Sequence, residues 1–241
     1  MKRLVIALAA AAILGGTGLA FFLGLIGGEG GGTVSGEAFV VSAYPQDAGA
    51  RWTCDDIKEI VNPAGADGFP RVVAVVEAQD VGVRLDVAGR YLASHMIARA
   101  KNGQPFSDEK AALRDIEDGY ILYIAALKDG LGVSEDEARS YLEQQTPGPC
   151  NVTAEGVTEN DALRTIQVER TKSRIVQKML KDLKPGEDVY QVMAARIAQE
   201  RPTVEITEVS FGMQGGLECT RDGAQVPCPP DLPAPEPAAT P

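Results

Sequence analysis

An uncharged, mostly apolar segment at the start of the chain constrains the fold most, because it suits a bilayer better than a domain core. Lys2 and Arg3 precede this segment, which runs from Leu4 to Gly28. A helix of about 20 apolar residues crosses a hydrocarbon core of about 30 Å, and flanking positive charges favour the cytoplasmic side. We therefore predict a transmembrane signal anchor at residues 1–28. The protein would be a single-pass cell-membrane protein with its domain on the extracytoplasmic side.

A cleaved signal peptide is the alternative interpretation of the same segment. Its shorter apolar core would run from Leu4 to Leu14, and the small residues at positions 18–20 would form the cleavage site. The apolar run continues through residues 21–26, however, which a cleaved peptide does not need. The sequence therefore favours the retained anchor, and the alternative is a protein secreted after signal cleavage.

The charge balance excludes two classes of partner. The 241 residues include 23 Lys and Arg against 34 Asp and Glu, which gives a formal net charge of −11. Nucleic acids and anionic lipid surfaces attract basic proteins and repel polyanions. We therefore expect no nucleic-acid partner, and we expect contact with the membrane only through the anchor.

Composition divides the rest of the chain into three parts. Residues 29–50 are rich in glycine and small side chains, which predicts a flexible tether. Residues 51–211 carry the regular apolar patterns of a single domain. Residues 212–241 form a cysteine-containing, proline-rich tail, in which seven of the 15 prolines lie from Pro227 onward. Because proline interrupts helices, we expect this proline-rich end to be extended or disordered.

Apolar residues recur at helical spacing through most of the domain. This periodicity, together with capping residues and Gly or Pro stop signals, predicts helices over residues 54–61, 85–101, 107–128, 134–145, 158–183 and 187–199. Two β-branched or alternating runs predict short strands at residues 71–76 and 203–211. We therefore expect a mainly α fold with a small sheet.

Three passages of the domain follow one another in a family-like order. They are a strand and turn at residues 73–81, a helix, glycine turn and capped helix at 112–138, and a long helix at 157–183. In this order they resemble the N-terminal chaperone domain of SurA-like and PrsA-like extracytoplasmic folding factors. That family usually has Asn-Gly in its opening turn, where Glu77 and Ala78 stand here. No segment fits the parvulin isomerase domain of the larger members. The resemblance therefore implies a SurA N-terminal-like helical domain without isomerase activity.

The resemblance also implies a function. It indicates a membrane-tethered chaperone or peptide-binding module that holds unfolded polypeptide segments without ATP, with unfolded or extended polypeptides as clients. Flexible and aromatic side chains adapt to varied clients, and the candidate peptide-binding residues are Leu92, Met96, Tyr120, Tyr123 and Met193. The alternative for these five residues is that they form the core. The alternative for the protein is a structural role, docking one fixed partner in an envelope complex.

Residues that would support catalysis or cofactor binding are sparse. His95 is the only histidine, and a lone histidine beside Met96 in a predicted helix is more often packed or exposed than catalytic. No glycine-rich loop matches a nucleotide-binding fingerprint, and no zinc-type cysteine pair accompanies the histidine. We therefore expect no enzyme activity, no cofactor and no metal site.

The four cysteines favour disulfides, because an even number in an exported chain is more typical of bridges than of metal sites. Four cysteines allow three pairings. Cys219 and Cys228 flank a short loop that contains Asp222 and Gly223, so a local bridge between them is expected. That bridge leaves Cys54 and Cys150 as a long-range pair.

Overall fold

The computed structural model describes residues 54–101, 109–144, 159–213 and 215–233. The predicted anchor at 1–28 and the predicted tether at 29–50 lie outside the described residues. Within the described ranges, no helix is long and apolar enough to cross a membrane, because even the longest, Glu109–Lys128 and Glu159–Asp182, carry several charged side chains. The described residues therefore do not support the prediction of a transmembrane helix in a single-pass membrane protein.

The described domain is a mixed α/β structure. Helices account for 58% and strands for 19% of the described residues, so the sheet is a major part of the fold. Its five antiparallel strands lie in the order β2-β1-β3-β4-β5. They are β1 (Val72–Ala78), β2 (Val83–Ala88), β3 (Glu205–Phe211), β4 (Leu217–Arg221) and β5 (Ala224–Val226). The prediction of a mainly α fold with a small sheet is therefore wrong.

Strand β2 replaces the predicted beginning of a helix. The spacing of Leu85 and Ala88 fits a helix, but residues 83–88 also alternate as a strand does. In the structure, Gly82 turns the chain with a φ of 63°, and Leu85 then pairs with Val76 of β1. Pairing with a neighbouring strand thus decides between two patterns that the same residues satisfy.

Strands β4 and β5 lie in the segment predicted to be a tail. Asp222 and Gly223 have φ values of 51° and 77°, the combination that a two-residue hairpin turn requires. Arg221 and Ala224 pair on either side of this turn. The segment therefore extends the sheet instead of leaving the domain.

Apart from the start of the second helix, the helices agree with the predicted ranges to within a few residues. The described α-helices are α3 (Cys54–Val61), α4 (Gly89–Lys101), α5 (Glu109–Lys128), α6 (Glu135–Gln144), α7 (Glu159–Asp182) and α8 (Val189–Glu200). Short 3-10 turns are η1 (Ala66–Gly68), η2 (Gln79–Val81) and η3 (Arg201–Thr203). The agreement reflects local signals such as Asp188, whose carboxylate accepts hydrogen bonds from the first backbone N–H groups of α8.

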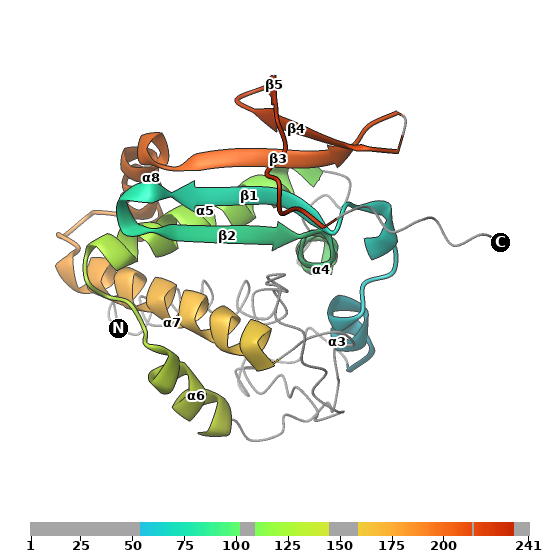
Figure 1. The fold of residues 1–241 in the computed structure, drawn as a ribbon. Coiled ribbons are helices and arrows are strands. Elements are labelled where there is room, and N and C mark those ends of the chain that lie inside the picture. The colour runs from blue at the N-terminus through green and yellow to red at the C-terminus, as the bar shows by residue number, and fades with distance from the viewer. Residues whose placement is uncertain (1–53, 102–108, 145–158, 214, 234–241) are drawn as a thin grey trace.

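The helices cover one face of the sheet (Figure 1). Helices α4 and α5 pack against β1 and β2, and the resulting core cluster includes Val76, Leu85, Leu92, Ile116 and Tyr120. A second apolar cluster joins α5, α7 and α8, and a third joins α6 to α7. Helix α7 therefore takes part in both of these clusters, which lie outside the main helix–sheet core.

The C-terminal segment covers the opposite face of the sheet. After β5 it runs back across the strands in Figure 1, and the Arg84–Asp231 ion pair of 2.6 Å ties it to β2. Val75 alternates with the inward-facing Ala74 and Val76, so its side chain points to this outer face, where it is fully buried. Residues 227–233 thus act as a strap, which contains a turn where the Leu232 N–H donates a hydrogen bond to the Pro229 carbonyl. Their sequence predicted an extended or disordered tail.

The strap is fixed covalently at its other end. Cys219 of β4 and Cys228 form a disulfide, which confirms the predicted local bridge. Cys150 and the side chain of Cys54 lie outside the described residues, so the predicted Cys54–Cys150 pair stays a prediction.

Candidate functional site

A hollow of about 340 Å³ lies between α7 and α8. Its apolar lining comes from both helices and from the loop between them. The apolar lining residues are Ile175, Met179, Leu183, Val192 and Ala195. Charged residues of both signs also line it, namely Asp129, Lys178, Asp182, Glu187 and Arg196. The hollow therefore has a small apolar surface that a ligand could contact, with charged side chains around it.

Local sequence signals explain why α7 and α8 form the two walls of this hollow. On α7, residues 175, 178, 179 and 182 are spaced so that they share one face of the helix. Gly186, with a φ of 93°, turns the chain after α7, and Asp188 caps the next helix. Because the loop is short, α8 runs back beside α7 and faces it with Val192 and Ala195.

The hollow sits on a packed apolar base. Leu122, Ala125 and Ala126 of α5 are buried against Ile175 and Val176 of α7. Met193 and Ile197 of α8 pack against the same cluster. The small alanines allow the helices to approach closely, so the floor of the hollow is part of a preformed core.

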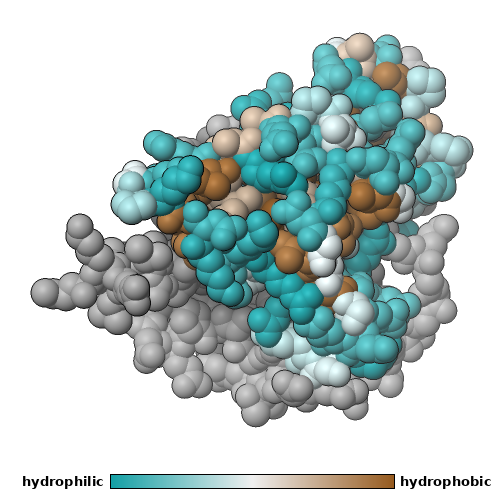
Figure 2. All heavy atoms as spheres, turned by 90° about the vertical axis from the view of Figure 1, so that its left-hand side faces the viewer, coloured by the Kyte–Doolittle hydropathy of each residue, from teal (hydrophilic) through white to brown (hydrophobic). Residues whose placement is uncertain are grey.

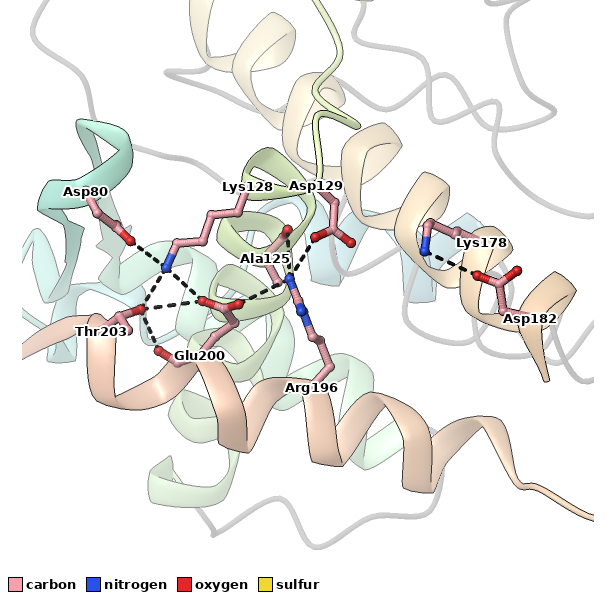
Figure 3. A network of polar contacts seen from close by, with 9 residues as sticks. All are labelled: Asp80, Ala125, Lys128, Asp129, Lys178, Asp182, Arg196, Glu200 and Thr203. Atoms are coloured by element: carbon pink, nitrogen blue, oxygen red, sulfur yellow. Dashed lines mark hydrogen bonds and ion pairs between the residues drawn. The ribbon is translucent and has the colours of Figure 1, made fainter. Parts of the chain in front are cut away.

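A polar network holds the end of α8 in place (Figure 3). The Lys128 ammonium at the end of α5 lies 2.6 Å from Asp80 of η2 and 2.7 Å from Glu200 of α8. It also donates to the Thr203 hydroxyl at 2.9 Å. The hydrogen bond from Lys128 lowers the pKa of the Asp80 carboxyl. One cation thus joins three separate elements.

Arg196 extends this network to the edge of the hollow. Its guanidinium lies 2.9 Å from Asp129 and 3.1 Å from Glu200. On the opposite wall, Lys178 pairs with Asp182 at 3.2 Å along α7 (Figure 3). The charged groups around the hollow are therefore largely paired with one another, which leaves the apolar lining as its main source of binding energy.

The surface near α8 presents its apolar side chains in separate areas. Figure 2 views the molecule from the left-hand side of Figure 1, where α8 lies, and shows hydrophobic areas divided by hydrophilic ones. A continuous apolar patch would be typical of a permanent interface. Small separated apolar areas are ordinary on protein surfaces, so the face seen in Figure 2 does not indicate a permanent interface.

The structure does not bring the five predicted peptide-binding residues together on one surface. Leu92 is completely buried and Tyr120 is 2% exposed, both in the main core. Met96 and Tyr123 pack against that core and are partly buried. Met193 lies in the other cluster, beneath the hollow. This burial agrees with the alternative that such side chains form the core.

Sequence reasoning did not select the residues that line the hollow. The available signal was a pair of apolar stripes on either side of Pro185 and Gly186, one containing Ile175 and Met179 and the other Val192. Two such stripes joined by a short loop predict helices that pack side by side. They do not predict how much of the surface between the two helices remains accessible to a ligand.

His95 lies in a buried polar cluster among α4, α5 and α7. It is 3% exposed, and Asp115 of α5 lies 3.7 Å from it. On α7, Lys172 pairs with Glu169 at 2.9 Å. Burial lowers the pKa of His95 to about 4, and the positive charges of Arg99 and Lys172 add to this effect. The imidazole is therefore neutral at physiological pH and enclosed, as expected for a structural histidine.

The described residues contain no group of His, Cys, Asp and Glu side chains that could hold a metal ion. Comparisons of the chain with protein families, with curated proteins and with solved structures found no match in any of the three. The resemblance to the folding factors therefore rests on the order of sequence elements alone.

Proposed function

We propose that this protein is a polypeptide-binding module that holds unfolded or extended segments of other chains without ATP, and that the α7–α8 hollow is its binding site. The observation that carries the proposal is an open apolar lining over a packed base, surrounded by charges that are already paired. The family-like order of sequence elements agrees with this class of function.

The size of the hollow limits what it accepts. Ligand sites typically span about 300–1,000 Å³, so about 340 Å³ suits one or two large side chains of an extended segment, not a folded domain. The unbranched, polarisable Met179 adjusts to different side-chain shapes. Burial of one large apolar side chain contributes about 1.5–3 kcal/mol. Such binding is weak, sequence-tolerant and reversible without an energy source.

A matched pair of substitutions on α8 tests the site. Ala195 and Ala198 are both exposed on the same helix, but only Ala195 lines the hollow. We expect Ala195→Lys to remove the ability of the full chain to slow aggregation of an unfolded client in the absence of ATP. Ala198→Lys should leave this ability unchanged. Light scattering of the client and polarisation of a labelled unstructured peptide measure the two effects.

The outcomes separate the proposal from its alternative. Equal behaviour of the two variants would exclude the α7–α8 hollow as the site. A wild-type chain that slows the aggregation of no client, but recovers one stoichiometric partner from its native source, would favour a protein that docks one fixed partner.

A further inference from the structure

A second hollow, of about 370 Å³, lies on the other side of α7, between α7 and α6. Its α7 wall consists of Arg170, Ser173, Arg174 and Gln177, whose spacing places them on one face of the helix. Ser140 and Tyr141 of α6 face them. In contrast to the α7–α8 hollow, this one is lined mainly by polar side chains and includes two guanidinium groups.

Arg170 is held in an unusual way for this protein. Its guanidinium carbon lies 3.6 Å from the centre of the Tyr141 ring, so the group is fixed against an aromatic face. In the part of the chain that the structure describes, no carboxylate forms an ion pair with Arg170. Other arginines do have acidic partners, for example Arg84, Arg196 and Arg221. The acidic chain thus leaves this cation in a hollow without an acidic partner.

The backbone around the α6–α7 hollow is held in place by hydrogen bonds between α7 and the turn before α6. Arg174 donates hydrogen bonds to the carbonyl of Gly132 at 2.8 Å and to the Glu137 carboxylate. The Thr171 hydroxyl accepts a hydrogen bond from the Val133 backbone N–H at 3.0 Å. These contacts fix the turn before α6 against α7. A ligand that enters therefore meets positioned groups and does not have to order them.

We propose that the α6–α7 hollow binds a carboxylate group, with Arg170 as the main contact. A planar guanidinium donates two parallel hydrogen bonds to a carboxylate, and contact with the Tyr141 ring limits the positions that the Arg170 guanidinium can take. The hydroxyls of Ser140 and Ser173 supply further donors on opposite walls. Two arginines and one glutamate give the hollow a local charge of +1, in a chain whose net charge is −11. This site is independent of the function proposed for the α7–α8 hollow.

Calorimetric titration of the full chain tests the site. The probes are succinate, an N-acetylated tripeptide with a free C-terminus, the amide of that tripeptide, and inorganic phosphate. We expect saturable binding of succinate, of the free-acid peptide or of both. Binding of succinate alone assigns the site to small acids, and binding of the free-acid peptide but not its amide assigns it to a chain terminus.

Variants connect the binding to Arg170. Arg170→Gln should weaken it about tenfold or more, as the loss of a charge-assisted hydrogen-bond pair does. Arg170→Lys should weaken it as well, because the charge remains but the two-pronged geometry is lost. Arg139→Gln is the matched control, since Arg139 of α6 pairs with Glu135 and does not line the hollow. Ala195→Lys, in the other hollow, should have no effect.

Three results would overturn the carboxylate site. One is the absence of saturable binding of both carboxylate probes to the wild-type chain. Another is binding of phosphate without either carboxylate. The third is an equal loss of binding in the Arg170→Gln and Arg139→Gln variants while both remain folded by circular dichroism.

Discussion

At the scale of single residues, burial determines the chemistry of His95. An exposed histidine exchanges its proton near pH 6.5, but burial removes His95 from water and so disfavours the charged form. The nearby cations Arg99 and Lys172 act in the same direction. A residue type that often serves in proton transfer is therefore kept neutral inside the domain.

The titration of His95 can be observed directly, because it is the only histidine of the chain. We expect its imidazole resonance to titrate with a pKa of about 4 in the folded protein. The unfolded chain in urea is the control and should titrate near pH 6.5. Since the unfolded chain then takes up a proton that the folded chain excludes, the free energy of unfolding should fall as the pH drops from about 6.5 to about 4. A folded-state pKa near 6.5 would show that the side chain is solvated.

At the scale of elements, single side chains connect segments that are far apart in the sequence. Lys128 joins α5 to η2 and α8, and the strap joins β4 to β2. These connections differ in their exposure to solvent. Exposure should therefore decide how much each one contributes to stability.

Lys128→Met tests the first connection. The Glu200 carboxylate is 9% exposed, and the substitution removes its Lys128 partner. We expect the free energy of unfolding to fall by about 1–3 kcal/mol in urea denaturation. Lys178→Met is the matched control, because the Lys178–Asp182 pair is exposed and should contribute less than about 0.5 kcal/mol. An equal loss in both variants would contradict the role of Lys128 as a connecting residue.

Replacing both Cys219 and Cys228 by Ser tests the strap. Their sequence separation is nine residues, for which the chain-entropy model gives about 2.5–3 kcal/mol of stability. We expect a loss of this size, with increased hydrogen exchange in β3 and β4. Asp231→Asn should cost less than about 1 kcal/mol, because its ion pair with Arg84 is partly exposed. Unchanged exchange in the double variant would show that the strap stays in place without the disulfide.

At the scale of the whole molecule, α7 separates two hollows of different character. The α7–α8 hollow has an apolar lining with three acidic and two basic residues, and the α6–α7 hollow is polar with two arginines and one glutamate. The strongly negative chain surrounds both. The electric field of this negative charge should attract basic segments to the α7–α8 hollow. The α6–α7 hollow differs, because its local charge is positive.

Association rates test the effect of the net charge on the proposed peptide binding. We expect an apolar peptide with basic flanks to associate with the full chain faster than the same peptide with acidic flanks. Raising the ionic strength from about 0.01 to 1 M shortens the screening length from about 30 to 3 Å, which should remove the difference. Stopped-flow fluorescence measures both rates. Identical rates at low salt would show that the net charge does not guide the encounter.

The sequence by itself determined those features that depend on neighbouring residues. Helical periodicity located most helices, and Gly130 and the Pro185–Gly186 pair marked the ends of two of them. The Cys219–Cys228 bridge was also predictable, since the two residues flank a short turn. In each case the deciding contacts lie within about one or two helical turns or one hairpin, so the local pattern contained them.

Only the tertiary structure decided three other features. These are the choice between helix and strand in β2, the position of the strap, and the apolar helix stripe that remains accessible to a ligand. Residues 83–88 fit both a helix and a strand, and pairing with β1 made the choice. The strap reaches Arg84 across more than 140 positions of sequence. Leu92 and Met179 both lie on apolar helix stripes, yet Leu92 is buried in the main core and Met179 is partly exposed in a hollow. The physical reason is that burial depends on which distant elements pack against a side chain, and local periodicity does not contain that information.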